Sequence, residues 1–584
     1  MLTVFSGCDP LKKTDWEQPQ VNIPLISDGS PLGAKEKSEI MSKTEKKNTF
    51  ANDSVKRAFN HILGVGFDDI IKRPIFHPHF EHDILKKSES VQKNIFKNAF
   101  LVFNKNNIGE MSFSPVDNVY VPKQRFIQRK CAYLEPEDCL KYLSLVVAIA
   151  GKIEQNRIPR QKNIVHSYRY NKTGKILFSK NYNYGTFRKQ SQRISSKTSY
   201  KYKIITDIAG FYEKINIHRI ESQLLSIGCD PNIVSKINQI LLTWAGRDSY
   251  GLPVGGDASR ILAEASLLDL DRFLVRRNIP YIRFVDDFRI FAKDMDEAAY
   301  YIQILQGRLA EDGLLLSTEK TEVVDLRAER TRGSDKHFKK DTDQNGNDDT
   351  EETEREAKNL AWSVYRGKVP LAFRRPTEPK KEDLKKLDVD AELQEIDVSI
   401  DPELGKIKDV IRAVLLQESS SAAEKTFSIL KIYIELVPYT VDMLISMKDE
   451  HPNPINKIRI NARDWLLDGR EKPDYVVISL VRLLAEFDQE IESVLTYLER
   501  LPRHGSTVVG REIFLLIIPR LGRSELLQMK QFYWRATPPE RRALIRSVIE
   551  NKSIHKKEKE PWLKTIRSVN ADIFIEDMIS RAKL

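Results

Sequence analysis

The chain has 584 residues, 41% of them hydrophobic and 30% charged, which suits a soluble globular protein of a few domains. Lys and Arg exceed Asp and Glu by 94 − 83 = 11, a balance compatible with a polyanionic partner, most simply nucleic acid, although charge alone does not decide this. Four cysteines without a C-x-x-C motif indicate neither a zinc ribbon nor a disulfide framework and favour a reducing cytoplasm. The longest apolar runs fall far below the roughly 20 residues of a membrane span, so no membrane partner is expected.

The first part of the chain divides by composition into two regions. Residues 1–50 are rich in Lys, Ser, Pro and Glu, which predicts a loosely ordered N-terminal segment. Residues 51–200 combine helical and strand-like patterns with many basic residues. The cluster "FHPHFEH" places His77, His79 and His82 close together there, but no further metal ligand is evident, so surface or core histidines are expected.

Residues 201–330 alternate strand-like and helical segments and hold the motifs that suggest chemistry. The stretch 281–291, "YIRFVDDFRIF", would suit a buried β-hairpin but for Asp286 and Asp287, because adjacent carboxylates among apolar residues repel each other and lose hydration. A divalent cation would neutralise them, and their hard oxygen atoms suit Mg²⁺. A third carboxylate is then expected at the end of another strand.

Asp207 is the candidate for that third carboxylate, because an apolar strand-like run ends just before it and a helical pattern follows. Tyr212 lies five residues further on. Downstream, "GLPVGGDASRILAE" is a glycine-rich loop in which Gly255 lets the backbone approach a substrate closely. The strand-like run "GLLLSTEKTEVV" follows the Asp pair and contains Lys320.

Residues 331–400 are interpreted as an acidic flexible linker, insertion and connection, because 331–358 is almost devoid of apolar side chains. Within it, residues 341–352, "DTDQNGNDDTEE", match the ligand spacing of an EF-hand calcium loop. Asp348 occupies a position that is usually apolar in such loops, and neither flank is an amphipathic helix, which weighs against Ca²⁺ binding.

Residues 401–584 have a purely helical pattern. Apolar residues recur at helical spacing, as at Ile407, Val410, Ile411 and Val414, and prolines punctuate the segments. This rhythm suggests stacked helical hairpins in a solenoid-like array, with a non-repeating helical bundle as the alternative.

Four motifs in order carry a resemblance to a known family. D-x-x-x-x-Y, G-L-P-x-G, F-V-D-D and L-x-x-x-K-T follow one another between Asp207 and Thr321. This order resembles motifs A to D of a reverse-transcriptase palm. The segments 163–178 and 207–224 are similar to those of the bacterial abortive-infection and other defence-associated reverse transcriptases.

The resemblance implies an α+β fold. The fingers would occupy residues 51–200, and the palm, a ferredoxin-like sheet with helices on one side, residues 201–330. An all-α helical-repeat domain would occupy residues 401–584 in place of a conventional thumb. Val254 stands in the glycine-rich loop where retroviral and many intron enzymes carry Gln, which puts ordinary template and nucleotide contacts in doubt.

Carried over to this sequence, the roles of the family describe a two-metal site. Asp207 and Asp286 would ligate two Mg²⁺ ions together with the backbone carbonyl of Ile208, and Asp287 would support the site. One ion would activate the primer hydroxyl and the other would neutralise the triphosphate and the leaving pyrophosphate. Lys320 would protonate or stabilise the pyrophosphate.

Four residues are assigned to the incoming nucleotide. Tyr212 would lie under its sugar and exclude a 2′-hydroxyl, which favours dNTPs over rNTPs. Gly255 would contact it through the backbone of the loop. Arg169 and Lys175 are chosen from a basic, tyrosine-rich segment to clamp the triphosphate, with a merely solvated basic loop as the alternative.

These assignments predict a Mg²⁺-dependent, RNA-directed DNA polymerase that adds dNTPs in bacterial anti-phage defence by abortive infection. The resemblance further implies that DNA starts on a hydroxyl of the protein, stays covalently attached to it and grows without a conventional template, in a cytoplasmic homo-oligomer. One alternative is an RNA-templated enzyme that copies an associated non-coding RNA. Another is a nucleic-acid-binding scaffold with an inactive palm, against which the presence of all four predicted catalytic side chains argues.

Overall fold

The computed structural model describes most of the chain. The described residues are 34–71, 75–104, 112–124, 127–246, 248–328, 330, 381–398, 404–500 and 506–582. The chain divides into two compact units, Met1–Thr49 and Phe50–Leu584, and the description below concerns the second. Residues 1–33 and the calcium-loop-like segment 341–352 lie outside the described residues.

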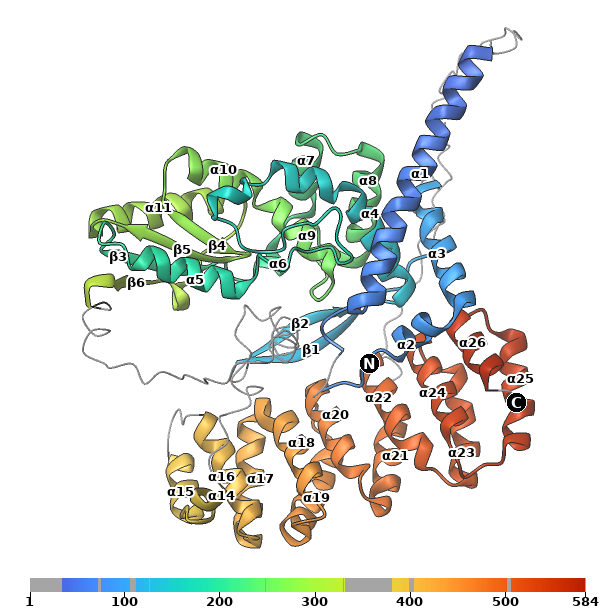
Figure 1. Cartoon of the computed structure of the whole chain (residues 1–584). Helices are drawn as coiled ribbons and strands as arrows, with labels where there is room; N and C mark the ends of the chain where they lie inside the picture. Colours follow the sequence, from blue (N-terminus) through green and yellow to red (C-terminus); the bar gives the residue numbers. More distant parts are fainter. Residues whose placement is uncertain are drawn as a thin grey trace, which may run out of the picture. The chain divides into compact units, whose positions relative to one another are not determined.

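The N-terminal part of the second unit combines helices with a two-stranded hairpin (Figure 1). Its elements are α1 (Ala34–Val65), which begins in the first unit, α2 (Phe80–Lys87), α3 (Glu89–Asn104), β1 (Asp117–Gln124), β2 (Ile127–Tyr133) and α4 (Pro136–Asn156). The two strands pair antiparallel, with Val119 opposite Cys131. Helix α4 starts at a proline followed by Glu137 and Asp138, residue types that suit a helix N-terminus, and most of its apolar length is buried.

A four-stranded antiparallel sheet follows along the chain. Its strands are β3 (Tyr202–Asp207), β4 (Tyr281–Phe284), β5 (Asp287–Ala292) and β6 (Glu322–Asp325), in the spatial order β4-β5-β3-β6. The helices between β3 and β4 are α6 (Phe211–Lys214), α7 (Ile217–Ser226), α8 (Pro231–Ala245), α9 (Asp257–Ser266) and α10 (Leu268–Arg276), and α11 (Met295–Glu311) lies between β5 and β6. This β-α-β-β-α-β path is that of ferredoxin-like folds.

Three further elements flank this sheet. They are η2 (Arg160–Lys162), α5 (Tyr184–Ser195) and η3 (Thr318–Lys320). Helix α5 begins with a capping box between Asn183 and Thr186, which satisfies backbone N–H groups at its start. The helix packs on β4 and β5, with Phe187 as its buried residue.

From residue 381 onward every described element is helical. The elements are α14 (Lys381–Lys385), α15 (Val389–Val398), α16 (Leu404–Leu416), α17 (Ser420–Ile432), η6 (Ile434–Leu436), α18 (Val437–Met447), α19 (Pro452–Leu467), α20 (Asp474–Leu484), η7 (Asp488–Glu490), α21 (Ile491–Arg500), α22 (Thr507–Ile517), η8 (Ile518–Arg520), α23 (Arg523–Met529), η9 (Lys530–Trp534), α24 (Pro538–Glu550), α25 (Lys556–Val569) and α26 (Ile573–Arg581).

These C-terminal helices pack mainly on their second neighbours, as α17 does on α19, α18 on α20, and α22 on α24. Figure 1 shows them side by side in a row. Second-neighbour packing lets consecutive helices share one continuous core. In the part of the chain that the structure describes, no helix combines the length and the apolar character of a membrane span.

Two hydrophobic cores hold the second unit together, and each joins segments that are far apart in the sequence. One core joins the C-terminal helices to Phe76, to Val119 of the β1–β2 hairpin and to Val254. The other joins α3, α4 and the four-stranded sheet, and includes Phe574 of α26. Residues 51–200, expected as one region, therefore contribute to both cores.

Candidate active site

The two strand ends that carry the predicted carboxylates meet in the sheet. Phe284 pairs with Asp287 across the β4–β5 hairpin, so Val285 and Asp286 form its two-residue turn. Strand β3 pairs with β5 so that Asp207 lies opposite Asp287. The backbone N–H of Ile208 donates to the carbonyl of Asp286 at 3.1 Å. The structure thus brings the three predicted carboxylates and Ile208 to one edge of the sheet.

The turn that presents Asp286 is strained. Val285 has a φ of +57°, a left-handed conformation that is rare for a β-branched residue and costs on the order of 1–3 kcal/mol. Hydrogen bonds hold its backbone on both sides. Its N–H donates to Ser167 Oγ at 3.0 Å, and its carbonyl accepts from Arg283 Nη1 at 3.2 Å. Such a conformation persists only where the surroundings impose it, as these two bonds do.

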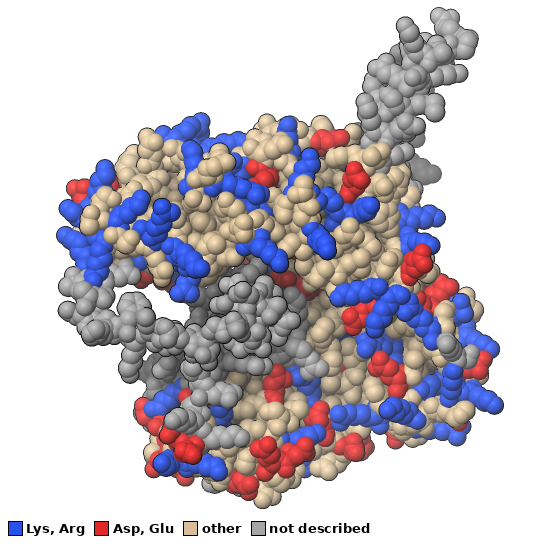
Figure 2. Space-filling model, in the orientation of Figure 1, with Lys and Arg blue, Asp and Glu red and all other residues tan. Residues whose placement is uncertain are grey.

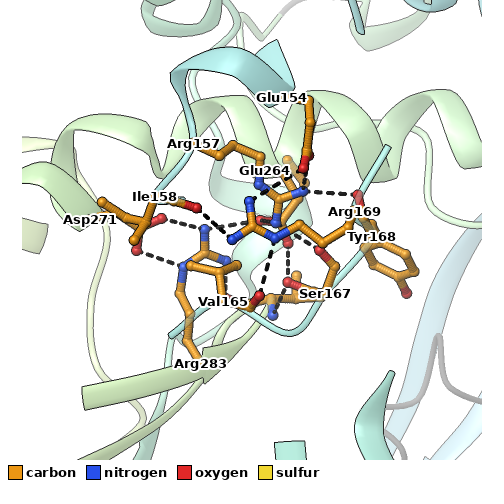
Figure 3. Close-up of polar contacts among 12 residues, drawn as sticks. Glu154, Arg157, Ile158, Val165, Ser167, Tyr168, Arg169, Glu264, Asp271 and Arg283 are labelled. Carbon is orange, nitrogen blue, oxygen red and sulfur yellow. Dashed lines mark hydrogen bonds and ion pairs between the residues drawn. The ribbon is translucent and has the colours of Figure 1, made fainter. Parts of the chain in front are cut away.

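A buried ion-pair cluster lies behind these two bonds (Figure 3). Ser167 Oγ donates a hydrogen bond to the carboxylate of Glu264. That carboxylate also forms ion pairs with Arg157 at 2.7 Å and with Arg283 at 2.9 Å. Arg283 donates to Asp271 through Nε at 2.8 Å and Nη2 at 2.6 Å. The strained turn is therefore bonded directly to a fully buried charge network.

Arg283 and Glu264 of this cluster are both held in their charged forms. Burial opposes ionisation of Arg283, but Asp271 and Glu264 raise its pKa above the usual value for arginine. Burial likewise opposes ionisation of Glu264, but Arg157 and Arg283 lower its pKa below the usual value for a glutamate. Opposite charges at these distances offset the cost of desolvation, which makes the cluster rigid but sensitive to loss of any one partner.

Arg169, predicted to clamp the triphosphate, belongs to the same cluster instead. Its side chain is 1% exposed, and it donates to the carbonyls of Ile158 at 2.6 Å and Val165 at 3.2 Å, with Glu154 at 3.5 Å (Figure 3). A guanidinium bonded in this way supports the fold and does not face a nucleotide. Lys175, the second predicted clamp residue, is exposed and does not line the cavity described next.

A cavity beside the turn is lined by Asp286 and by several basic side chains. Its lining includes Asp286, Tyr212 and Gly255, all predicted site residues, and three cations that the sequence analysis did not select. These cations are Lys123 of β1, Arg129 of β2 and Arg260 of α9. Lys123 and Arg129 flank the turn of one hairpin, but no feature of the sequence shows which hairpin faces the carboxylates.

Arg260, which lines the cavity, is fixed by two carboxylates. Its guanidinium forms ion pairs with Asp257 and Asp69 and lies 5.1 Å from the centre of the Tyr168 ring. His61 bonds Asp257 in turn, with Nε2 2.6 Å from Oδ2. Burial lowers the pKa of Arg260 to about 10. Its position is therefore set by neighbours that also neutralise part of its charge.

Gly255 is required where it lies for two reasons. Its φ is +129°, and a Cβ there would come within 2.2 Å of Ile70 Cδ1. The preceding carbonyl of Val254 accepts from the Ala132 N–H at 3.0 Å, which fastens the loop to β2. Tyr212 joins the same loop, because its carbonyl accepts from the Leu252 N–H at 2.9 Å. The loop thus links the hairpin to the residue predicted to lie under the sugar.

Lys320 approaches the carboxylates from η3. Its Nζ lies 3.4 Å from Asp207 Oδ1, and its side chain is 40% exposed whereas that of Asp207 is 3% exposed. Asp287 forms an ion pair with Arg289 at 2.8 Å. Both interactions reduce the repulsion among the three carboxylates in this arrangement.

The oxygen donors at this edge of the sheet suit a hard divalent cation. Among the described residues, no group of three or more His, Cys, Asp or Glu side chains is gathered closely enough to hold a metal by itself. Mg²⁺ is usually bound by one or two carboxylates plus substrate phosphates and water. Asp207, Asp286 and the Ile208 carbonyl therefore fit a site that substrate phosphates complete.

The residues of this site lie in a segment that matches a known family. Residues 152–360 match the family described as reverse transcriptase (RNA-dependent DNA polymerase). The chain contains a reverse transcriptase domain. The match confirms the expected enzyme class, RNA-directed DNA polymerase, and it implies nucleotide substrates, a nucleic-acid template and divalent metal ions. The matched residues include the Asp turn, Asp207 and Lys320, whereas Lys123 and Arg129 lie outside them.

Solved structures with some similarity to this chain include two telomerases. One is telomerase from Candida albicans in complex with a fragment of telomeric RNA, at 12% identity, 71% coverage of each chain and a TM-score of 0.28. The other is apo telomerase from Candida tropicalis, at 11% identity, 67% and 73% coverage and a TM-score of 0.28. A search of curated proteins found no match.

Proposed function

We propose that this chain polymerises dNTPs into DNA by two-metal catalysis, with Mg²⁺ held by Asp207, the Ile208 carbonyl and Asp286, and with Asp287 in support. The observation that carries this proposal is the register of the sheet, which sets Asp207 opposite Asp287 and bonds Ile208 to the Asp286 carbonyl. The ions would activate the attacking hydroxyl and neutralise the departing pyrophosphate.

The side chains around the cavity have distinct tasks in this proposal. Lys123 and Arg129 contact the triphosphate, in place of Arg169 and Lys175. Tyr212 lies beneath the sugar and excludes a 2′-hydroxyl, and burial keeps it a neutral phenol by raising its pKa above the usual range. Positioned cations of this kind stabilise charge that develops on the phosphates in the transition state.

Lys320 is proposed as the proton donor to the leaving pyrophosphate. It can form charge-assisted hydrogen bonds with phosphate oxygens. Its position beside Asp207 and its partial exposure support this role, because it can turn from the carboxylate to an entering nucleotide.

The biological setting we propose is bacterial anti-phage defence by abortive infection, in a cytoplasmic homo-oligomer. DNA would start on a hydroxyl of the protein, remain attached to it and grow without a conventional template. The support is the motif resemblance, Val254 in the glycine-rich loop, and the second-neighbour packing of the C-terminal helices, which fits the helical-repeat domain of that branch.

An RNA-templated enzyme that copies an associated non-coding RNA is the second candidate. It is favoured by the description of the matched family as RNA-dependent. A scaffold with an inactive palm is less consistent with the site, because a strained turn and a buried charge cluster serve the presentation of Asp286.

One assay separates these candidates. The purified full chain is incubated with labelled dNTPs and Mg²⁺ with no added nucleic acid, and the products are resolved before and after protease treatment. Protein-linked DNA supports self-priming, whereas synthesis that nuclease removal of co-purified RNA abolishes supports the templated enzyme. Absence of incorporation with every template and primer tested, or full activity in Asp286→Asn, would overturn the polymerase proposal.

A further inference from the structure

The positive charge of this protein is concentrated in one segment. Residues 155–206 contain thirteen Lys and Arg and no Asp or Glu. The whole chain has a net charge of +11, so the rest of it carries 11 − 13 = −2. Asp and Glu make up 83 of 584 residues, so this stretch of 52 would hold about seven at the average frequency. An ordinary solvated segment mixes both signs, whereas this segment contains cations only.

Most of these cations lie on the surface. The exposed ones are Lys162, Lys172, Lys175, Lys180, Arg188, Lys189, Arg193, Lys197 and Lys201. No described carboxylate forms an ion pair with any of these nine side chains. Figure 2 shows that Lys and Arg outnumber Asp and Glu on the visible face of the part that holds the sheet and α5. On the C-terminal helices, basic and acidic residues are mixed.

Helix α5 and the loops beside it form a groove within this surface. Lys189 and Arg193 line it from one face of the helix, together with Asn163, Tyr182 and His166. Like charges four residues apart destabilise a helix by a few tenths of a kcal/mol when nothing lies between them. A bound anion would remove that cost, and the amide, phenol and imidazole groups would supply further hydrogen bonds.

Helix α5, which carries part of this surface, also contacts the hairpin that holds the Asp turn. The ring of Phe187, on the buried side of α5, packs on Phe284 at a centroid distance of 6.2 Å. The guanidinium of Arg289 lies 5.4 Å from the centre of the Phe187 ring and bonds Asp287 at 2.8 Å. One helix therefore contacts the carboxylate hairpin on its buried side, and on its exposed side presents cations that pair with no described carboxylate.

We propose that the exposed cations of residues 155–206, centred on the α5 groove, bind the phosphate backbone of a single-stranded nucleic acid that enters or leaves the catalytic turn. This inference rests on the proposed polymerase function, which requires a polyanion beside Asp286 and Asp287. Groups of cations that follow a backbone, with polar and aromatic side chains between them, are typical of single-strand binding without sequence readout.

A lipid surface fits these residues less well. Peripheral membrane binding by cations is usually joined by large apolar side chains that insert between lipids. None of the large hydrophobic side chains that are strongly exposed belongs to residues 155–206, all of which the structure describes.

The test compares two triple variants with equal change of charge. One is Lys189→Glu/Arg193→Glu/Lys197→Glu on the proposed surface. The control is Lys552→Glu/Lys556→Glu/Lys557→Glu, three exposed lysines near the C-terminus, and each triple lowers the net charge from +11 to 11 − 6 = +5. Binding of a fluorescein-labelled oligothymidylate of about 16 nucleotides is measured by anisotropy across a salt series, without dNTPs or Mg²⁺.

The surface triple is expected to bind at least about tenfold more weakly, with the slope of log K against log salt reduced by about 2 for three lost phosphate contacts. The control triple is expected to stay within about twofold of the native protein. Equal losses in the two triples, or no loss in the surface triple, would overturn the proposal. So would equal or tighter binding of a DNA duplex, of polyglutamate, or of vesicles that contain phosphatidylserine.

Failure of this proposal can be told apart from failure of the polymerase proposal. Binding is measured in Asp286→Asn as well, which should bind the oligothymidylate normally. If no dNTP is incorporated but the surface triple alone loses binding, the surface is real and the polymerase assignment is wrong. If dNTPs are incorporated and the surface triple binds normally, the surface assignment is wrong.

Discussion

The buried cluster under the Asp turn and the surface around α5 use the same residue types in opposite ways. Under the turn, Arg157, Arg169 and Arg283 face Glu154, Glu264 and Asp271, and the charges balance within hydrogen-bonding distance. On the surface, nine cations face solvent with no acidic residue in the segment. Balanced buried charges fix a geometry, whereas unbalanced exposed charges bind a mobile polyanion at little cost to stability.

The largest expected effect is on catalysis at the turn. Asp286→Asn should reduce dNTP incorporation on the order of a thousandfold or more, equivalent to about 4 kcal/mol, because a neutral amide is a poor ligand for Mg²⁺. Asp287→Asn should have the smaller effect, since Asp287 only supports the site. Single-turnover incorporation rates measure both, and an equal loss in the two variants would contradict the unequal roles assigned here.

The next largest effect is expected on the stability of the fold when a residue of the buried ion-pair cluster is replaced. Arg283→Met should destabilise the protein by about 3–5 kcal/mol, because it leaves Asp271 and Glu264 buried without their shared partner. Arg272→Met is the matched control, since Arg272 pairs with the half-exposed Asp269 and should cost at most about 1 kcal/mol. Urea unfolding followed by circular dichroism measures the difference, and similar values for the two variants would show that the cluster does not hold the turn.

A second buried pair predicts a pH dependence of stability. Burial opposes the charge on His79, but Asp68 at 2.7 Å and Glu81 raise the pKa of His79 to about 9 from 6.5. A raised pKa contributes stability that is complete below pH 6.5 and disappears as pH rises through 9, by about 3 kcal/mol at most. Unfolding free energies at pH 6.5 and pH 9.5 should show this fall, and His79→Gln should lose it.

The smallest effect expected at the turn comes from one hydroxyl. Ser167→Ala removes the acceptor of the Val285 N–H and should lower kcat about tenfold with little change in KM, because substrate binding does not involve Ser167. The fold should lose only about 1–2 kcal/mol. Ser167→Thr keeps the hydroxyl and should restore most of kcat. A change in KM without a change in kcat would show that Ser167 does not position the turn.

The exposed α5 surface should respond differently from the buried residues of the four preceding predictions. Its triple variant should change the unfolding free energy by no more than about 0.5 kcal/mol per site, since exposed side chains that pair with no described carboxylate contribute little to folding. A large loss of stability there would remove the distinction between the two regions.

Local sequence predicted well which carboxylates meet at one edge of the sheet. Asp207 stands at the end of a strand, and Asp286 lies in a tight turn between two others. The register in which these strands pair follows from the need to bury their apolar residues, and this pattern can be read from the sequence. The helical pattern after residue 401 was equally readable, since a 3.6-residue period is a local property. The structure forms helices there.

The basic residues of the site were not predictable in the same way. Arg169 and Lys175 looked suitable because they lie in a basic segment close to the palm motifs, yet one is buried in an ion-pair cluster and the other faces solvent. Lys123 and Arg129 line the cavity from a distant hairpin. Charge and spacing do not distinguish a cation that pairs with a buried acid from one that faces a ligand, because that depends on which elements pack together.

The amino-acid sequence by itself therefore determined the carboxylates, the order of the motifs and the class of polymerase they belong to, because these depend on short stretches and their order. Only the tertiary structure decided how the Asp turn is held and which cations line the cavity beside it. Val285 adopts its strained conformation because Ser167 and Arg283, brought in from other elements, bond its backbone. Contacts of that kind arise from packing, and no periodicity in the chain encodes them.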